Sequence, residues 1–392
     1  MPVSRKIQSD MRNASEIRRL FEEGIRLKEI HGPGNVADLS LGNPIVEPPS
    51  EFASTVCDLV RQRAGMHRYM PNLGFPWVRA AVADALTAQG YFDALGPQHV
   101  MMCAGAAAGM NVVLKTILNP GEKVVVVAPY FVEYRAYVEN HGGELTVVQP
   151  AEDFSLDVGK IGAAITRRTR AVIINSPNNP TGVVYSRENL AELAEMLYQK
   201  RRFTQQAIYV VSDEPYREII YDGETFSSIA SLYTESFMVY SFSKSLGIPG
   251  ERIGYVAVNP AMEDCRAIMD GMAICNRILG FVNAPALMQR AVAELAVRVD
   301  VDGYRLKRDM IKRTLQDNGY EFARPQGTFY IFARCPDEER AFIDRAREML
   351  LLVVPGSAFG YRGWFRIAYC VDEHTVELAC QKLSDLAETC RS

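Results

Sequence analysis

The residues best suited to chemistry in this chain of 392 residues gather around Lys244. Ser241 and Ser243 precede it, Arg252 follows eight positions later, and the apolar run 237–240 before them is predicted to be a buried strand. Desolvation and a nearby cation lower the pKa of a lysine and make its amine a nucleophile toward carbonyls. An arginine fork suits a phosphate. These residues therefore fit an aldehyde that carries a phosphate, although a loop lysine and a surface arginine would look the same locally.

Small and polar residues follow two further predicted strands. Gly105, Ala106 and Ala107 open a helix, and the free backbone N–H groups at such a helix start form a natural anion site. Asn179 lies between prolines in a turn, where a rigidly held side chain can donate to a phenolate oxygen. Taken alone, each segment is also explained by a tight helix start or by turn chemistry.

A carboxylate, an aromatic ring and an arginine occupy other predicted strands. Asp213 ends an apolar strand; a carboxylate fixed beside a ring nitrogen keeps that nitrogen protonated, and a turn acid is the alternative. Phe131 ends another strand and could stack on a planar ring or pack in the core. Arg366 interrupts an apolar strand, and a buried arginine needs a partner such as a substrate carboxylate or an internal acid. Together these groups describe a pyridine aldehyde bearing a phosphate, which is pyridoxal phosphate.

The elements that must position these residues alternate along the chain. Apolar runs predict strands at 100–103, 122–128, 145–148, 171–175 and 207–212. The amphipathic helices between them indicate a largely parallel sheet covered on both faces, and ligands bind beyond the carboxyl ends of such strands. After residue 260 long helices dominate, with strands predicted at 328–332 and 364–368.

The predicted fold is therefore α/β, with a large domain built on a mostly parallel sheet covered by helices on both faces and a smaller α+β domain made from the N- and C-terminal segments. We expect residues 1–48 to form an N-terminal arm and part of the small domain. Residues 49–285 would form the large pyridoxal-phosphate-binding domain, and residues 286–392 the small C-terminal domain. The first helix is expected over 13–29, with Asn13 as its cap.

Composition argues against several classes of function. The net charge of −4 gives no general attraction to nucleic acid or to anionic membranes. The N-terminus lacks a signal-peptide pattern, and the longest apolar runs are too short to span a bilayer. The eight cysteines are scattered, without C-x-x-C or metal-ligand spacing, so we expect reduced thiols in a cytoplasmic protein and no metal site. Small molecules and a second copy of the chain are the expected partners.

The motifs as a set resemble those of the class I/II aminotransferases of pyridoxal-phosphate fold type I, and among these the aspartate aminotransferase-like members. The matching segments run in the family's order and spacing over nearly the whole chain: Gly105-Ala106-Ala107, Asn178–Gly182, Asp213 with Tyr216, Ser241–Lys244, Arg252 with Gly254, and Arg366. The resemblance implies an enzyme that moves an amino group between an L-amino acid and a 2-oxo acid by a ping-pong mechanism, with pyridoxal 5'-phosphate as cofactor.

The resemblance also implies a role for each matching residue around the cofactor ring. Lys244 would bind the aldehyde and shuttle the substrate proton. Asp213 would pair with the pyridine nitrogen, and Asn179 and Tyr216 with the ring hydroxyl oxygen. Phe131 would stack on the ring, where the family often has a tryptophan.

The same resemblance assigns the phosphate to a group of donors around the helix start at Gly105. These donors are Arg252, Ser241, Ser243 and the backbone N–H groups of Ala106 and Ala107. Many relatives have a hydroxyl where this chain has the two alanines, so backbone donors must suffice. Tyr69 would reach the phosphate of the neighbouring subunit, which implies a homodimer with shared active sites.

Substrate choice rests on fewer residues. Arg366 would bind the substrate α-carboxylate, helped by Asn179 and the backbone of Gly42. Arg277 lies within about one position of the arginine that in aspartate aminotransferases crosses the dimer to bind the distal carboxylate, which favours aspartate and 2-oxoglutarate. A surface arginine is the alternative, and an aromatic or alanine aminotransferase or a carbon–sulfur β-lyase on the same scaffold then stays open. A dehydrogenase would need G-x-G-x-x-G, and a cofactor-binding regulator a fused DNA-binding domain, neither of which the sequence shows.

Overall fold

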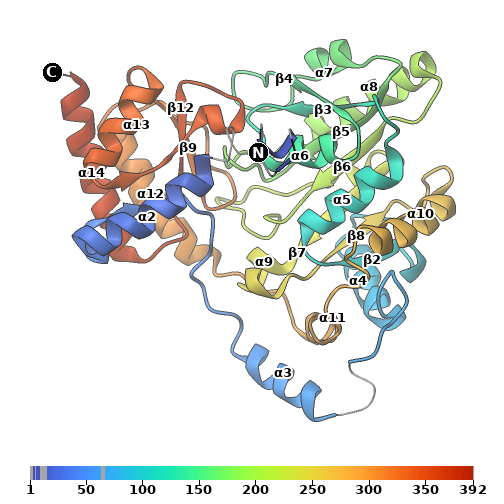
Figure 1. Cartoon of the computed structure of the whole chain (residues 1–392). Coiled ribbons are helices and arrows are strands. Elements are labelled where there is room, and N and C mark those ends of the chain that lie inside the picture. The colour runs from blue at the N-terminus through green and yellow to red at the C-terminus, as the bar shows by residue number, and fades with distance from the viewer. Residues whose placement is uncertain (1–2, 5, 9–15, 63–66, 392) are drawn as a thin grey trace.

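The computed structural model describes residues 3–4, 6–8, 16–62 and 67–391. A seven-stranded sheet of order β2-β8-β7-β6-β5-β3-β4 lies at its centre (Figure 1). The strands are β2 (Val100–Cys103), β3 (Lys123–Val127), β4 (Glu144–Val148), β5 (Thr169–Asn175), β6 (Tyr209–Asp213), β7 (Ser236–Ser241) and β8 (Gly254–Val258). The pairs from β4 through β7 are parallel, and β8 is antiparallel to both of its neighbours. The predicted mostly parallel sheet is therefore confirmed.

Both faces of this sheet are buried because its strands are apolar at consecutive positions. Val124 and Val126 point into one core cluster, whereas Val125 and Val127 point into another on the opposite face. The helices α5 (Ala106–Ile117), α6 (Glu133–Asn140) and α10 (Cys265–Ile278) cover the first face. The second face is covered by α7 (Val158–Ala164), α8 (Arg187–Thr204), α4 (Pro76–Ala88) and α11 (Ala286–Glu294).

A smaller α+β part, here called the small-sheet part, contains a three-stranded antiparallel sheet of order β11-β12-β9. Its strands are β9 (Tyr330–Arg334), β11 (Val354–Pro355) and β12 (Trp364–Ala368), and its helices are α2 (Glu16–His31), α12 (Val301–Asp317), α13 (Glu339–Glu348) and α14 (Glu373–Arg391). In addition β1 (Ala37–Asp38) pairs in parallel with β10 (Leu351–Leu352), so a segment from the N-terminal part of the chain lies beside one from the C-terminal part. This arrangement confirms the smaller part predicted from the terminal segments, whereas the boundaries at 48/49 and 285/286 stay a prediction.

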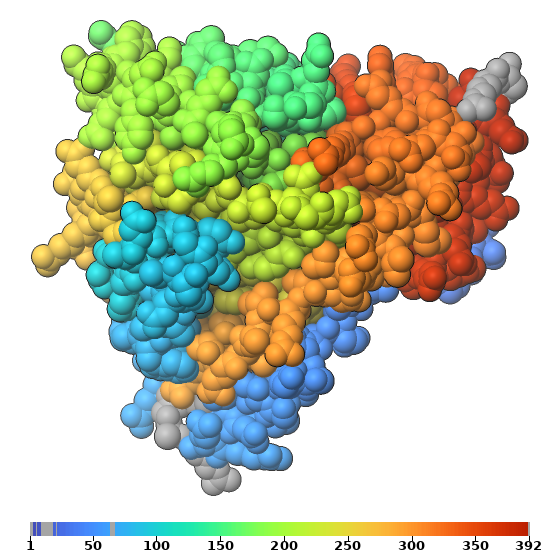
Figure 2. Space-filling view, turned by 180° about the vertical axis from the view of Figure 1, so that it is seen from behind, coloured from blue at the N-terminus to red at the C-terminus, as the bar shows by residue number. Residues whose placement is uncertain are grey.

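Several short elements connect these layers. The helix α3 (Glu51–Arg61) projects from the main body and packs on α11 through Leu59 and Ala291, and Figure 2 shows these neighbours from behind. Short 3-10 helices occur at Pro33–Asn35, Pro97–His99, Ile229–Ser231, Pro249–Glu251 and Gly356–Phe359, and α9 (Phe242–Ser245) is a single turn. The predicted helix cap at Asn13 lies outside the described residues. None of the described helices is long and apolar enough to cross a membrane.

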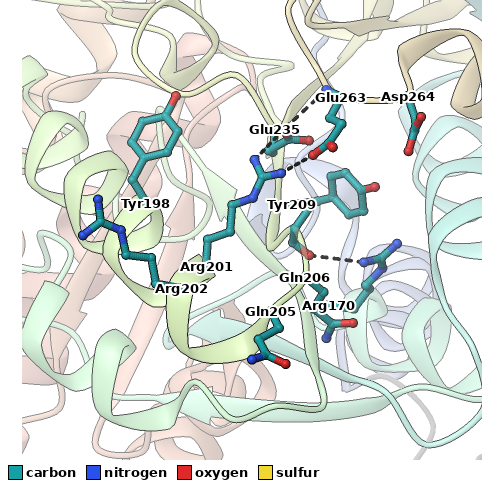
Figure 3. A pocket seen from close by; sticks show the side chains of 11 residues that line it. Arg170, Tyr198, Arg201, Arg202, Gln205, Gln206, Tyr209, Glu235, Glu263 and Asp264 are labelled. Carbon is teal, nitrogen blue, oxygen red and sulfur yellow. Dashed lines mark hydrogen bonds and ion pairs between the residues drawn. The ribbon is translucent and has the colours of Figure 1, made fainter.

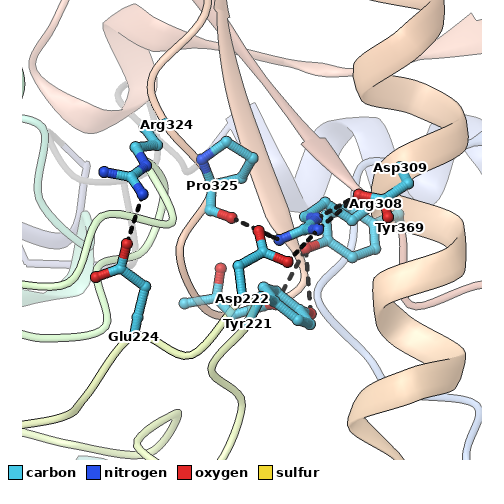
Figure 4. A network of polar contacts seen from close by, with 9 residues as sticks. Tyr221, Asp222, Glu224, Arg308, Asp309, Arg324, Pro325 and Tyr369 are labelled. Carbon is cyan, nitrogen blue, oxygen red and sulfur yellow. Dashed lines mark hydrogen bonds and ion pairs between the residues drawn. The ribbon is translucent and has the colours of Figure 1, made fainter.

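A polar network fastens the loop after β6 to the small-sheet part (Figure 4). Arg308 on α12 is buried and donates two hydrogen bonds to Asp222, at 2.7 and 3.0 Å, while its guanidinium lies 4.6 Å from the Tyr221 ring. Arg324 donates to Glu224 at 2.7 Å. Because a buried guanidinium is costly without acceptors, this pairing keeps the loop, and the site residues just before it, against α12.

Candidate active site

A cavity of about 290 Å³ lies at the carboxyl ends of the parallel strands and is closed on its other side by the small-sheet part. The predicted site residues that line it are Gly42, Ala106, Ala107, Phe131, Asn179, Asp213, Tyr216, Ser241, Ser243, Lys244, Arg252 and Arg366. Of the remaining predicted residues, Gly105 is the N-cap of α5, next to Ala106 in the cavity wall. Tyr69 and Arg277 are not among the residues that line the cavity.

Lys244 sits on α9, whose start is capped by the Ser241 hydroxyl, which accepts from the Ser243 N–H at 3.2 Å. The lysine Nζ donates to the Gly42 carbonyl at 2.6 Å. Burial lowers the pKa of Lys244 to about 8; Cys370 opposes this shift, and the Arg366 and Arg252 charges add to it. About a tenth of the amine is therefore uncharged at pH 7, and this fraction can act as a nucleophile toward a carbonyl.

Asp213 ends β6 in a buried position with one oxygen unpaired. Its Oδ2 accepts from the Tyr134 hydroxyl at 2.6 Å, whereas Oδ1 has no hydrogen-bond partner in the described part of the chain. Burial raises the pKa of Asp213 to about 6, against the opposite effect of the Tyr134 hydrogen bond. A buried carboxylate oxygen without a donor is costly, so Oδ1 fits a ligand that brings an N–H, as a protonated pyridine nitrogen does.

The turn after β5 is held by an asparagine that the sequence reading missed. Asn175 donates to the Asp213 carbonyl at 2.8 Å and accepts from the Asn179 N–H at 2.7 Å. The Asn179 side chain in turn accepts from Arg366 at 3.0 Å. One amide side chain therefore fixes the backbone of both Asp213 and Asn179 relative to the sheet.

Arg366 on β12 is 2% exposed and forms no ion pair with any described residue. Its Nη2 donates to the Ser40 carbonyl at 2.6 Å, and its Nε has no partner within the described ranges. Burial lowers its pKa. The internal acid that the sequence allowed as a partner is not found among these residues, so the guanidinium can take a ligand carboxylate.

The other end of the cavity collects donors for an anion. Gly105 has a φ of 81°, and a Cβ at this position would lie 2.5 Å from Nη2 of Arg252. Glycine thus lets the guanidinium approach the start of α5, where the N–H groups of Ala106 and Ala107 have no intrahelical acceptor. The hydroxyls of Ser241 and Ser243, 2.7 Å apart, line the same cavity. This donor set fits a phosphate.

Two aromatic neighbours complete the cavity wall. The hydroxyl of Tyr216 lies 3.0 Å from that of Tyr330, a residue not predicted as part of the site. Phe131 meets Tyr134 edge to face, with the ring centroids 5.6 Å apart. Phe131 therefore lines the cavity from a position braced by the same tyrosine that binds Asp213.

A second hollow, of about 750 Å³, lies at the amino ends of β5, β6 and β7 (Figure 3). There Arg201 pairs with Glu235 at 3.3 Å and with Glu263. Arg170 donates to the Ala207 carbonyl at 3.3 Å and stacks on the ring of Tyr209. The charges of Arg201 and Arg170 already have partners, and no lysine is among the residues that line this hollow, so the cavity around Lys244 is the better candidate for the catalytic site.

Comparison with known proteins shows the family of the chain. The family model for aminotransferase class I and II matches residues 35–383. The chain belongs to this family. The aminotransferase is 32% identical to an aspartate aminotransferase of Pyrococcus abyssi, over 95% of this chain and 96% of that protein. It is 30% identical to aromatic-amino-acid aminotransferase 2 of Thermococcus litoralis, again over 95% and 96%.

Solved structures give the same result. An amino transferase from Eubacterium rectale superposes with a TM-score of 0.95 at 33% identity and covers all of both chains. The predicted family, enzyme class and dependence on pyridoxal phosphate are thereby confirmed.

Proposed function

We propose that this aminotransferase uses the cavity around Lys244 to move an amino group between an L-amino acid and a 2-oxo acid, with aspartate and 2-oxoglutarate as its preferred pair. The observation that supports the proposal most strongly is the buried guanidinium of Arg366, unpaired by any described acid, in the same cavity as a lysine with a lowered pKa. A substrate that carries both an amino group and a carboxylate satisfies both groups at once.

Pyridoxal phosphate, when bound, supplies an aldehyde and an electron-withdrawing ring. The unpaired Oδ1 of Asp213 would accept the ring N–H, and Tyr216 and Asn179 would bind the ring hydroxyl oxygen. Phe131 would stack on the ring. Arg252, with the donors that surround the start of α5, would hold the phosphate.

Lys244 has two tasks in this proposal. Its uncharged amine would bind the aldehyde of the cofactor, and with the substrate amine in that place the freed Nζ would hold the proton that leaves the substrate Cα. A pKa of about 8 suits both tasks, because Nζ must be able to gain and lose a proton near neutral pH. Arg366 holds the carboxylate, so that the Cα proton lies within reach of Nζ.

A homodimer is the expected working form. Tyr69 is 91% exposed, and Arg277 is exposed on α10 between Ile274 and Ile278, which are 61% and 62% exposed. An exposed tyrosine and an arginine among exposed apolar side chains are typical of a surface that a second copy covers. We propose that Tyr69 completes the partner's phosphate site and that Arg277 binds the distal carboxylate there. The described cysteines are all free, which favours the cytoplasm.

The test is the visible absorption of the purified protein after addition of pyridoxal phosphate. We expect a yellow band that aspartate or glutamate bleaches and that 2-oxoglutarate restores. Lys244→Ala should lack the band and the turnover while unfolding at the wild-type temperature. Absence of the band from the wild-type protein would refute the proposal.

Substrate choice is read from the same titration. Arg277→Ala should raise the half-saturating concentration of dicarboxylic amino acids only. Arg266→Ala is the control, because Arg266 is also an exposed arginine of α10. Bleaching mainly by aromatic amino acids would favour the activity that the name of the Thermococcus litoralis relative carries. Release of pyruvate and ammonia without any 2-oxo acid would instead indicate the carbon–sulfur β-lyase.

A further inference from the structure

Tyr330, at the start of β9, touches both halves of the proposed site. Its side chain is 2% exposed and lines the cavity, its hydroxyl lies 3.0 Å from that of Tyr216, and its ring centroid lies 4.6 Å from the guanidinium carbon of Arg366. We propose that Tyr330 is a positioning residue whose ring holds the arginine for the substrate carboxylate and whose hydroxyl orients Tyr216 toward the cofactor. This inference rests on the function proposed above.

The ring has a clear electrostatic task. Arg366 is buried without an acid among the described residues, so its charge must be stabilised in another way. The rings of Tyr330 and Phe359 lie 4.6 and 4.9 Å from its guanidinium carbon, and the attraction between a cation and an aromatic ring is strongest where water is excluded. Stacking occupies the face of the guanidinium and leaves its N–H edge for hydrogen bonds to a carboxylate.

The hydroxyl has a separate task. A phenol has one proton to donate, so a Tyr216 that donates to the cofactor needs a donor of its own to fix its oxygen. The two hydroxyls lie 3.0 Å apart, and a Tyr216 that spends its proton on the cofactor can only accept in this pair. The direction of the pair is therefore from Tyr330 to Tyr216.

The surroundings of Tyr330 are built for a fixed position. Its N–H donates to the Thr328 hydroxyl at 3.0 Å, and the Thr328 carbonyl accepts from Tyr221, a member of the network in Figure 4. A Cβ at Gly42 would overlap the Tyr330 hydroxyl, so only glycine lets this backbone approach and offer its carbonyl to Lys244. Tyr330 thus contacts Gly42, whose carbonyl accepts from Lys244, and also Arg366 and Tyr216.

Two variants of the holoenzyme separate the two tasks. Tyr330→Phe keeps the ring, so the concentration of the best amino acid that half-bleaches the band should stay within about twofold. The yellow band of the holoenzyme is also titrated with pH. The pH at which half of the band remains should rise by about half a unit to one unit, because a less well oriented Tyr216 leaves more negative charge on the hydroxyl oxygen of the cofactor ring. Tyr330→Leu removes the ring, and the half-bleaching concentration should rise about tenfold.

Tyr304→Phe is the matched control. Tyr304 is buried in the same core, its ring lies 5.5 Å from that of Phe329, its hydroxyl has no partner in the described ranges, and it does not line the cavity. This variant should leave both readouts unchanged; equal shifts in it would overturn the proposal. An unshifted midpoint in Tyr330→Phe would also overturn it, even if the leucine variant fails to fold. A wild-type protein without any band would instead remove the proposed function itself.

Discussion

Replacing Asp213 with asparagine should stabilise the cofactor-free protein above pH 6 and weaken cofactor binding at the same time. Asp213 is buried, accepts from Tyr134 at one oxygen and has no described partner at the other. Burial raises its pKa from 3.8 to about 6. An asparagine can still accept from Tyr134 through its amide oxygen but carries no charge, so the variant keeps the contact and loses the buried ionised group.

The size and sign of the effect follow from this pKa. Because the folded protein binds the Asp213 proton more tightly than the unfolded chain, this carboxyl makes the free energy of unfolding fall as the pH rises from about 4 to about 6. A shift of roughly two units corresponds to about 3 kcal/mol, fully present above pH 6. At pH 5 about half of this free energy is present. The gain in the free energy of unfolding that Asp213→Asn brings to the cofactor-free protein should therefore about double between pH 5 and pH 8.

Urea unfolding of the cofactor-free wild type and variant at several pH values measures this difference, and the other carboxyls cancel in the comparison. Asp222→Asn is the control of opposite sign, because the Arg308 hydrogen bond lowers the pKa of Asp222; its loss should destabilise the protein, by an amount that is already complete at pH 5 and is the same at pH 8. With pyridoxal phosphate present the wild type should be more stable than Asp213→Asn, because the ring N–H then gives Oδ1 of Asp213 a partner. An advantage that is equal at pH 5 and pH 8 would refute the reasoning.

Two further substitutions test the two ends of the cavity. Gly105→Ala should weaken pyridoxal phosphate binding by at least about tenfold in an absorbance titration, because φ is 81° and the new Cβ would meet the Arg252 guanidinium. Gly90→Ala, with a φ of 73° and no atom near the added Cβ, is the control with the strain but without the collision, and an equal loss there would contradict the argument. Arg366→Leu should raise KM about a hundredfold for every amino acid while the visible band of the holoenzyme is unchanged, since hydrogen bonds to a charged group contribute roughly 2–3 kcal/mol. A loss confined to dicarboxylic substrates would show that Arg366 binds the distal carboxylate instead.

The residues that act through their own functional group were predictable from the sequence. Asp213 ends an apolar strand, Arg366 interrupts one and Lys244 closely follows one, positions where a polar group is conspicuous, and the structure brings all three to one cavity. The Val-rich runs likewise predicted the buried strands of the large sheet, because residues apolar at consecutive positions need cover on both faces.

The residues that act through a distant neighbour were not predictable. Tyr134 binds Asp213 across 79 positions of sequence, and Tyr330 meets Tyr216 across 114. No local spacing marks such a pair, because an aromatic residue in a helix or strand has the same pattern when it only packs. The strand β8 was missed for a different reason: Gly254 was read as part of the motif after Arg252, although the apolar run 255–258 that follows it has the pattern of a buried strand.

The hydrogen bonds that close the cavity join residues very far apart in the chain. Lys244 reaches Gly42 across 202 positions, and Arg366 reaches Ser40 across 326. During synthesis the N-terminal segment must therefore wait for nearly the whole chain before its contacts exist, and such non-local closure comes late in folding. A growing chain that already exposes its reactive lysine still lacks the arginine that recruits a substrate. Bleaching of the cofactor's colour by the amino acid should accordingly appear only with completed molecules, which makes it a direct readout of full-length folding in translation reactions.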